Sequence, residues 1–276
     1  EACQFVVLMD DELALELGAD IHGAVPDVFI NADGFKKSIS APGPGNYLTV
    51  AKAVASAVQL LGLDAVRSRS FVHAHGSSTP ANRVTESEIL DRVAAAFGIE
   101  QWPITAVKAF VGHSLATASG DQVIAALGAF KYGIVPGLKT IDAVAGDVHQ
   151  QHLSLSTVDR KLGAQAMDVA FINSKGFGGN NASALVLAPH VVERMLRKRH
   201  GQAAFDAYLA RREATRTAAA AYDSQALLGQ LDIIYNFGND MIDDQAISIT
   251  TEEVKVPGFD QPLVFRKDER YSDMLD

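Results

Sequence analysis

The stretch TAVKAFVGHSLATASGDQV, residues 105–123, combines the end of a predicted strand, a tight turn and the start of a predicted helix. It begins within a short apolar segment, residues 104–107, that predicts a strand and brings Lys108 to its end. A Val-Gly turn then leads to His113. The five small residues at 116–120 come next, and Asp121 opens a predicted helix that continues through residue 132. Because a helix N-terminus offers unpaired N–H groups and a positive dipole end, this strand-turn-helix unit suits developing negative charge.

Strands and helices alternate on both sides of this unit. Apolar runs predict strands at residues 5–9, 21–30, 70–75, 104–107, 138–141, 169–173 and 182–187. Apolar residues at helical spacing predict helices at 10–17, 47–61, 85–97 and 121–132. Thr85 and Glu88 form a possible capping box, and residues 34–46 predict a loop. The alternation indicates an α/β sheet with helices on its faces.

The composition changes after Pro189. Residues 190–231 are rich in Arg, Ala and Glu with helical patterning, and residues 232–276 are acidic with strand-like pieces at 247–256 and 263–265. We therefore expect one part at residues 1–188 and an extension at 189–276 that packs on it.

The totals describe a protein with a sizeable core. The chain has 276 residues, of which 48% are hydrophobic, and its net charge of −9 argues against general nucleic-acid binding. One cysteine, Cys3, excludes an internal disulfide and a cysteine-rich zinc cluster, which favours a cytoplasmic protein. The sequence predicts no membrane span or signal peptide, and its start without Met suggests a fragment or a processed chain.

Three segments carry residues suited to catalysis, each just after a predicted strand. They are FVHAHGSSTPANRVTE (71–86), VKAFVGH (107–113) and NSKGFGGNNA (173–182). In open α/β sheets, ligands bind outside the carboxyl ends of the strands, where these segments are expected to meet.

Taken alone, each segment has a simpler interpretation. A lone histidine at a strand end is more often structural than catalytic. His73 and His75 alternate on one strand, but no carboxylate or cysteine lies at ligand spacing, so we do not expect a metal. The glycine loop lacks a following Lys-Ser/Thr and is not expected to be a phosphate loop. Lys108 and Glu86 could form a partly buried ion pair.

Together, in this order, the three segments resemble the second half of a β-ketoacyl-acyl-carrier-protein synthase, a condensing enzyme of the thiolase superfamily. HGSSTPANRVTE resembles that family's H-G-T-x-T-P motif with its downstream Glu, VKAFVGH resembles K-S-N-I-G-H, and NSKGFGGNNA resembles N-S-F-G-F-G-G-T-N-A. The resemblance covers about residues 1–188. It implies the C-terminal half of a thiolase-like αβαβα layered fold, followed by the extension.

The resemblance implies a decarboxylative Claisen condensation. In the family a cysteine holds the acyl chain, and two histidines donate N–H bonds to the malonyl thioester oxygen as CO2 leaves. His75 and His113 match these two histidines, although the sequence does not settle their tautomers. Lys108 matches the lysine behind the second histidine, and Glu86 matches that lysine's carboxylate partner.

The glycine loop matches the family's oxyanion loop. Phe177 matches the residue whose backbone N–H joins the oxyanion hole and whose ring gates the acyl pocket. The remaining residues assigned to substrate binding and to the shape of this loop are Gly176, Gly178, Gly179, Thr79 and Asn173.

The chain departs from the family at several positions. The nucleophilic cysteine lies in the half of the fold that is absent here, and Cys3 is interpreted as a buried structural thiol. Lys175 replaces an aromatic residue ahead of the glycine loop. Phe110 and Val111 occupy the Asn-Ile positions beside the second histidine.

The family implies the partners. Acyl-CoA or acyl-carrier protein and the malonyl-carrier protein are the expected substrates, with phosphopantetheine as a substrate arm, and neither a cofactor nor a metal is needed. A homodimer is expected, without nucleic-acid or membrane binding. The basic runs 194–201 and 210–216 could dock an acidic carrier protein, or simply be solvated helix faces. With ANRVTES and Lys175, the extension resembles a divergent bacterial branch that starts fatty-acid chains from acetyl-CoA.

Two rivals stay open at this level. A thiolase would use similar histidines but requires a second active-site cysteine near the glycine loop, and none follows Cys3. A non-catalytic chain-length-factor-like partner of a ketosynthase would not need both His75 and His113. The residue at the upstream nucleophile position would separate this partner from an enzyme in fatty acid or polyketide synthesis.

Overall fold

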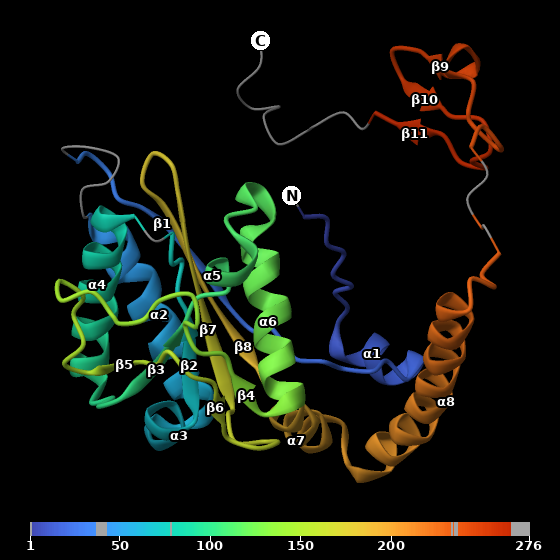
Figure 1. The fold of residues 1–276 in the computed structure, drawn as a ribbon. Helices are drawn as coiled ribbons and strands as arrows, with labels where there is room; N and C mark the ends of the chain where they lie inside the picture. The colour runs from blue at the N-terminus through green and yellow to red at the C-terminus, as the bar shows by residue number, and fades with distance from the viewer. Residues whose placement is uncertain (1, 37–42, 78, 233, 235–236, 266–276) are drawn as a thin grey trace, which may run out of the picture. The chain divides into compact units, whose positions relative to one another are not determined.

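A computed structural model of the chain describes residues 2–36, 43–77, 79–232, 234 and 237–265 (Figure 1). These residues fall into two compact units, Glu1–Ala218 and Ala219–Asp276, which we call unit 1 and unit 2. The main sheet of unit 1 contains β1 (Val28–Ala32), β2 (Ser70–His73), β3 (Trp102–Thr105), β5 (Leu153–Leu155), β7 (Val169–Gly176) and β8 (Asn180–Leu187). A separate pair consists of β4 (Ile134–Val135) and β6 (Arg160–Lys161).

The helices of unit 1 connect and cover these strands. They are α1 (Asp11–Leu17), α2 (Pro44–Leu61), α3 (Leu63–Ser68), α4 (Pro80–Phe97), α5 (Lys108–Val111), the 3₁₀ turn η1 (Leu115–Thr117), α6 (Ala118–Tyr132) and α7 (Pro189–His200). Helix α8 (Gln202–Leu227) begins in unit 1 and ends in unit 2.

The six strands follow the order β1-β8-β7-β2-β3-β5. Strands β7, β2, β3 and β5 are parallel, whereas β8 pairs antiparallel with β7 and with β1. The mixed α/β sheet predicted from the alternation is confirmed. Its parallel strands β2, β3 and β7 all end at one edge, and the three motif segments include or follow those ends.

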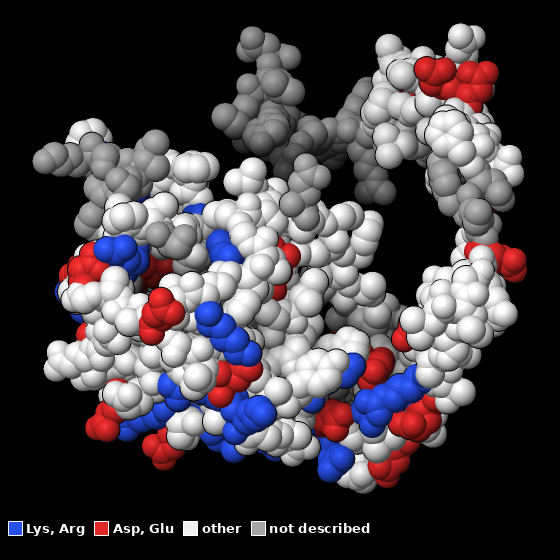
Figure 2. Space-filling model, viewed as in Figure 1, with Lys and Arg blue, Asp and Glu red and all other residues white. Residues whose placement is uncertain are grey.

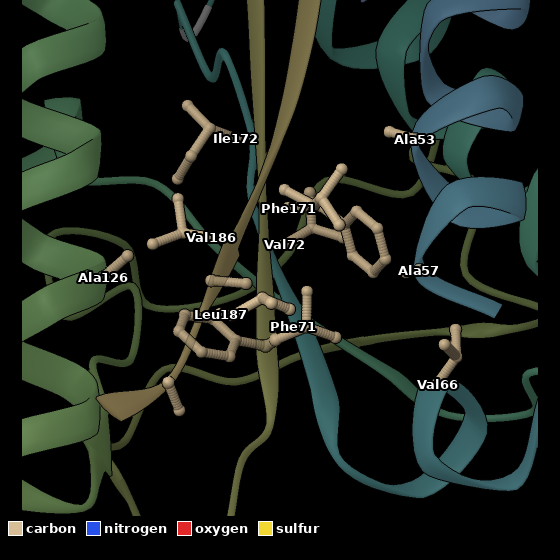
Figure 3. Close-up of a cluster of buried hydrophobic side chains, with 14 of the residues drawn as sticks. Ala53, Ala57, Val66, Phe71, Val72, Ala126, Phe171, Ile172, Val186 and Leu187 are labelled. Carbon is tan, nitrogen blue, oxygen red and sulfur yellow. The ribbon is translucent and has the colours of Figure 1, made fainter. Parts of the chain in front are cut away.

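The core lies on both faces of this sheet. In Figure 3, Ala126 of α6 points at the strands from one side, and Ala53 and Ala57 of α2 face them from the other. Phe71, at the centre of the sheet, is completely buried. Burial of apolar area at roughly 25 cal/mol per Å² is the main force that holds the helices to the strands. The edge at which the parallel strands end is therefore supported by helices on both faces of the sheet.

Local signals explain most helix boundaries. Asp10 caps α1 by accepting a hydrogen bond from the N–H of Leu13 at 2.8 Å, and Gly18 ends the helix in the left-handed region at φ 63°. Helix α2 begins at Pro44, three residues before the predicted start, because proline is favoured in the first helical turn. The predicted loop 34–46 is therefore shorter, and its residues 37–42 lie outside the described residues.

The predicted capping box at Thr85 and Glu88 is wrong. Helix α4 begins at Pro80, and its N-cap is Thr79, whose Oγ1 accepts a hydrogen bond from the N–H of Asn82 at 3.4 Å. Thr85 lies inside the helix and donates its hydroxyl to the carbonyl of Ala81. Helix α6 likewise begins at Ala118, three residues before Asp121.

Several predicted strands are absent or displaced. The apolar run 5–9 forms no strand and is exposed, since it pairs with no strand among the residues that the structure describes. The predicted strand 21–30 is reduced to β1, preceded by a single bridge between Ala24 and Leu187. Residues 138–141 form turns, and the short strands β4, β5 and β6 lie on either side of them. An apolar run therefore forms a strand only where another strand lies beside it to pair with.

Cys3 is exposed, so its interpretation as a buried thiol is wrong. The residue precedes α1 in the segment that forms no strand, and no core surrounds it. The side chain of Gln4 reaches Asp121 at the start of α6 through a hydrogen bond.

The two units differ in how much they bury. Helix α7 and the start of α8 belong to the core of unit 1, where Val191, Phe205 and Tyr208 are completely buried. The structure thus places its unit boundary at residue 218, whereas the predicted division at residue 188 stays a prediction. Unit 2 contains the turn η2 (Asp244–Ala246) and a small antiparallel sheet of β9 (Ser248–Ile249), β10 (Glu253–Lys255) and β11 (Leu263–Val264).

Candidate active site

His75 lies just beyond the end of β2, where hydrogen bonds from the backbone to Glu86 hold it in place. The N–H of His75 donates to Glu86 Oε1 at 2.6 Å, and the N–H of Gly76 donates to Glu86 Oε2 at 2.9 Å. These bonds connect the turn after β2 to the body of α4. Because both are charge-assisted, they fix the backbone of His75 more firmly than neutral hydrogen bonds would.

Glu86 is buried, and its carboxylate receives two further donors. Asn82 Nδ2 donates to Oε2 at 3.0 Å and Asn173 Nδ2 donates to Oε1 at 2.7 Å. No ion pair joins Glu86 to Lys108 among the described residues. The carboxylate therefore organises the backbone and amides around His75 rather than pairing with the lysine.

Lys108 begins α5 rather than ending β3, which stops at Thr105. The lysine is buried, and within the described part of the chain its Nζ has no hydrogen-bond partner. Burial lowers the pKa of Lys108, while the carboxylates of Glu86 and Asp121 oppose that effect. The ammonium thus acts on the site as a charge near the histidines.

His113 follows the short helix α5 through Gly112, whose φ of 74° turns the chain. The N–H of Leu115 donates to His113 Nδ1 at 3.1 Å. Leu115 adopts a φ of 62°, a left-handed conformation that is unfavourable for a residue with a side chain. This strain aims one backbone N–H at the imidazole.

The two histidines come together although 38 residues separate them along the chain. The ring centroids of His75 and His113 lie 5.3 Å apart, with an interplanar angle of 80°. The N–H of Lys175 donates to His75 Nδ1 at 3.2 Å, as Leu115 does for His113. In a neutral imidazole whose Nδ1 accepts, the proton is on Nε2. The geometry therefore assigns an Nε2–H donor to each ring.

The surroundings keep both imidazoles uncharged at neutral pH. Burial lowers the pKa of His75 to about 4, with Lys108, His113 and Lys175 adding to the effect and Glu86 opposing it. Burial, and then the charge of Lys108, also lowers the pKa of His113. Two neutral N–H donors on neighbouring rings can stabilise one oxygen on which negative charge develops.

A buried amide network connects the strand ends. Asn173 Oδ1 accepts from Asn46 Nδ2 at 2.7 Å, and Asn173 Nδ2 donates to Asn46 Oδ1 at 3.2 Å. Gln122 Nε2 lies within hydrogen-bond distance of the carbonyls of His73, Ala74 and Asn173, at 3.1, 2.8 and 3.0 Å. Gln122 thereby joins α6 to the ends of β2 and β7.

The glycine loop is the turn between β7 and β8. Gly178 and Gly179 have φ angles of 81° and 85°, and the ring of Phe177 is 83% exposed. Asp33 holds this loop: its N–H donates to the carbonyl of Gly179 at 2.8 Å, and its Oδ1 accepts from Asn181 Nδ2 at 2.8 Å.

Asp33 is itself buried and charged. Its Oδ1 also accepts from the N–H of Gly45 at 3.0 Å, and Lys36 Nζ donates to its Oδ2 at 2.8 Å. Burial raises the pKa of Asp33, but the hydrogen bonds from Lys36 and Asn181 outweigh it, so the pKa lies below its usual value. The carboxylate is therefore ionised and acts as a fixed anchor for the loop.

A cavity of about 650 Å³ adjoins this site. It lies among α4, the ends of β3 and β5 and the segment 138–148, and Lys108, Glu86 and His113 contribute to its lining with mostly apolar side chains. Its volume is within the usual range of ligand pockets, roughly 300–1,000 Å³. The neighbourhood of His113 thus has room for an organic substrate.

The structure brings most of the predicted site residues to one edge of the sheet. His75, Glu86, Lys108, His113 and Asn173 are joined by hydrogen bonds, ring contact or charge. Thr79 caps α4 beside Ser77, with 3.4 Å between their hydroxyl oxygens. Gly176 pairs with Asn180 in the last strand pair before the glycine loop.

Sequence reasoning missed four residues that support the site: Asp33, Asn46, Leu115 and Gln122. Asn46 belongs to the predicted loop 34–46 but lies buried in the first turn of α2. Gln122 has the helical spacing of the small apolar residues Ala118 and Ala126, and a polar residue on such a face is a signal that could have found it. Nothing in the pattern around Leu115 predicts its positive φ.

His73 lies apart from the histidine pair. It is completely buried and packs edge-on against Phe71, with 5.6 Å between ring centroids. No group of three or more metal-ligating side chains occurs among the described residues. A search of the same residues finds no helix with the length and apolarity needed to cross a membrane.

Comparison with known proteins gives a consistent result. Residues 22–142 match the family model of the β-ketoacyl synthase C-terminal domain. The whole chain is 74% identical over 276 residues to the β-ketoacyl-[acyl-carrier-protein] synthase FabY of Pseudomonas aeruginosa and covers 43% of that protein. The chain therefore spans less than half the length of this curated relative.

Solved structures agree with the sequence matches. The crystal structure of the noncanonical ketosynthase FabY from P. aeruginosa matches 97% of this chain with a TM-score of 0.82 and 75% identity, and the chain covers 42% of it. An oxazolomycin ketosynthase domain from Streptomyces albus matches 64% of the chain, and 32% of its own length, with a TM-score of 0.57. At 20% identity the second match shows the fold alone. The predicted fold class is confirmed.

Proposed function

We propose that this chain belongs to the β-ketoacyl synthase family and acts in a decarboxylative Claisen condensation. Two findings support this: residues 22–142 match the model of that family's C-terminal domain, and the chain is 74% identical to a β-ketoacyl-[acyl-carrier-protein] synthase. The proposed enzyme is an acyltransferase that joins an acyl thioester to malonyl-acyl-carrier protein. The observation that carries the proposal is the pair of neutral imidazoles at 5.3 Å, each with Nδ1 occupied by a backbone N–H.

The two rings would act on one oxygen. The thioester carbonyl of the malonyl group accepts hydrogen bonds from Nε2–H of His75 and of His113. The bond to the carboxylate breaks, CO2 leaves, and the electron pair delocalises onto that oxygen as an enolate, which the two N–H groups stabilise. The enolate carbon then attacks the acyl thioester carbonyl, and a cysteine thiolate departs. We propose that this cysteine belongs to a segment outside these 276 residues.

The remaining site residues support these groups. Glu86 and Asn173 hold the turn that carries His75, and Lys108 supplies positive charge behind the pair. The backbone N–H of Phe177 is proposed to complete an oxyanion hole for the acyl carbonyl, with its exposed ring as a gate. Gly176, Gly178 and Gly179 shape this loop, and Thr79 is proposed to contact the pantetheine arm.

The proposed partners follow from the chemistry. Malonyl-carrier protein and an acyl-CoA such as acetyl-CoA, or an acyl-carrier protein, are the substrates in a cytoplasmic homodimer. The pathway is fatty-acid or polyketide synthesis, and the 74% identity to a β-ketoacyl-[acyl-carrier-protein] synthase supports the carrier protein as partner. Neither a cofactor nor a metal is needed, because the electrons come from decarboxylation. We propose residues 1–188 as the condensing-enzyme part and residues 189–276 as its extension.

The test is His113→Ala in the full-length protein, with His149→Ala, an exposed histidine away from the pair, as the matched control. We expect the acyl-enzyme to form normally, as seen by intact mass, while release of ¹⁴CO2 from malonyl-carrier protein falls at least about a hundredfold, as for loss of an oxyanion donor. His149→Ala should keep the wild-type rate. Unchanged condensation in His113→Ala would refute the proposal.

A further inference from the structure

Lys175 is a cation built into the candidate site at a position where the related motif has an aromatic residue. It lies on β7, opposite Asn181 of β8, one residue before the glycine loop. Its backbone N–H donates to His75 Nδ1 at 3.2 Å. Its side chain is partly buried, so burial lowers the pKa of its ammonium, while Glu86 and Asp33 oppose that effect.

Side chains two residues apart on a strand share a face, so Lys175 lies on the same face as Asn173, whose amide donates to Glu86. Its cross-strand neighbour Asn181 donates to Asp33. Strand β7 therefore places Lys175 on the face that meets these two carboxylates, within backbone hydrogen-bond distance of the first histidine.

The titratable groups that act on His75 come from α4, α5, β7 and the segment after α5. Helix α4 contributes Glu86, α5 contributes Lys108, the segment after α5 contributes His113, and β7 contributes Lys175. With both imidazoles neutral, these groups comprise two cations and one carboxylate. A net positive charge next to two N–H donors favours an anion that forms between them.

Charges farther out act on the two lysines. Asp33 and Lys36, from the segment after β1, act on Lys175, and Asp121 of α6 acts on Lys108. Lys36 is joined to Asp33 by an ion pair of 2.8 Å. The cations that act most strongly on His75 are Lys108 and Lys175.

We propose that Lys175 is a positioning residue for the decarboxylation step, whose ammonium supplies the positive potential in which His75 and His113 stabilise the enolate oxygen. The proposal rests on the proposed function for its chemistry. The side chain makes no bond to the substrate in this account. It acts through His75, because a nearby cation disfavours the imidazolium form and so preserves the neutral Nε2–H donor.

The physical consequences of removing the ammonium have a definite sign. Without it, imidazolium formation is less unfavourable, so the pKa of His75 rises toward its ordinary value. The enolate also loses one stabilising charge. The acid limb of the decarboxylation rate should therefore move to higher pH, and kcat should fall, whereas KM for the malonyl substrate should change little because the effect is on the transition state.

The experiment compares three variants in the full-length protein. Lys175→Met removes the charge and keeps most of the side-chain length, Lys175→Arg keeps the charge, and Lys52→Met removes an exposed charge on α2 as the matched control. Two readouts are used: the titration of His75, followed by NMR of ¹³C-labelled histidine and assigned with His75→Gln, and the pH profile of ¹⁴CO2 release from malonyl-carrier protein. Thermal unfolding verifies that each variant is folded.

For Lys175→Met we expect the titration midpoint of His75 to rise by about one unit and kcat to fall about tenfold. Lys175→Arg should restore both values, and Lys52→Met should change neither. An unchanged midpoint in folded Lys175→Met, or a change in KM alone, would overturn the role of Lys175. If the wild-type protein released no CO2, the proposed function would fail, yet the titration would still decide whether the ammonium controls His75.

Discussion

Two backbone N–H groups determine what the histidine pair can do. The donors to Nδ1 come from Lys175 for His75 and from Leu115 for His113. The sequence motifs named both histidines, but a motif cannot show which ring nitrogen carries the proton. That information comes from Leu115, whose left-handed backbone has no sequence signal, and from the strand position of Lys175. At this scale, the residue types were predictable and the tautomers were not.

His73 provides a test of the electrostatics away from the catalytic pair. Burial, and then the charge of Lys108, lowers its pKa to about 3, against 6.5 in an unfolded chain. The unfolded state therefore binds a proton below pH 6.5 that the folded state does not bind until about pH 3. The contribution of His73 to stability is full above pH 6.5 and is lost as pH falls.

We expect His73→Leu to lose part of the acid sensitivity of the protein. Between pH 7 and pH 5 the free energy of unfolding of the wild type should fall by about 2 kcal/mol more than that of His73→Leu. Urea denaturation at the two pH values measures this difference, with His149→Leu, at an exposed histidine, as the control. Equal losses in the wild type and His73→Leu would show that His73 is not held neutral.

The elements place these residues by a simple rule of parallel sheets. Strands β2, β3 and β7 run in the same direction, so their carboxyl ends meet at one edge. The sequence was sufficient to predict these three strands, because each is a short apolar run followed by small or polar residues. It was sufficient to predict α6 and α2 to within three residues, because Pro44 and the small residues before Asp121 allow helix initiation.

Other elements could not be predicted because their signal is not local. The run 5–9 is as apolar as a strand, yet a strand also needs a neighbour, and the sequence does not show whether one is present. Thr79 and Thr85 are both residue types that can cap a helix N-terminus. In the structure Glu86 binds the turn after β2 from within α4, so the helix already begins before Thr85 and Thr79 is the cap. Asp33 and Asn46 act through contacts that span more than 120 residues, which periodicity cannot reveal.

The glycine loop offers a matched pair of substitutions. Gly179 has a φ of 85°, and a Cβ there would lie 3.0 Å from Asp33 Cβ, whereas a Cβ at Gly176 would meet nothing closer than 3.5 Å. We expect Gly179→Ala to lower the free energy of unfolding by about 1–3 kcal/mol and to impair condensation, because positive φ is costly with a side chain.

Gly176→Ala should be close to neutral, with an effect below about 1 kcal/mol. Thermal unfolding and single-turnover condensation assays on both variants provide the comparison. If the two alanines behaved alike, the loop would not be held in the conformation described here.

Helix α7 is the element on which carrier docking can be tested. Arg199 forms an ion pair with Asp11 at 2.8 Å, and the guanidinium of Arg197 lies over the ring of Phe205 at 4.6 Å, so both have internal roles. Arg194 and Lys198 are exposed and form no ion pair among the described residues. Figure 2 shows basic and acidic side chains interspersed on the face in view, so docking would depend on local charges.

We expect reversal of the charge at Arg194 and Lys198 to raise KM for malonyl-carrier protein several-fold while leaving the rate with malonyl-CoA unchanged. The reason is that only the carrier protein presents an acidic surface to the helix. Steady-state kinetics with both donors at two salt concentrations would measure this. An unaltered KM for the carrier-borne substrate would remove α7 from the docking surface.

At the scale of the whole molecule, the two units differ in their cores. Unit 1 buries complete side chains on both faces of its sheet, whereas no described residue of unit 2 is buried. Several large apolar residues of unit 2 are exposed, among them Phe237, Ile249 and Phe259. A segment without a core has few contacts to oppose local opening.

Hydrogen exchange should reveal this difference. We expect peptides from β7 and β8 to remain protected for hours, and peptides from α8 after Ala218 and from β9 to β11 to exchange within minutes. Mass spectrometry of exchange in the full-length protein provides the measurement. If β10 were as strongly protected as β7, the expectation that unit 2 opens readily would be wrong.

The central claim is that His75 and His113 serve one oxygen, and a double-mutant cycle on malonyl decarboxylation tests it most directly. The rates to measure are those of the wild type, His75→Ala, His113→Ala and the double variant. We predict that each single substitution removes most of the acceleration and that the double variant loses little more, because the donors act as a unit. Losses that add in full, as for two independent sites, would contradict the account.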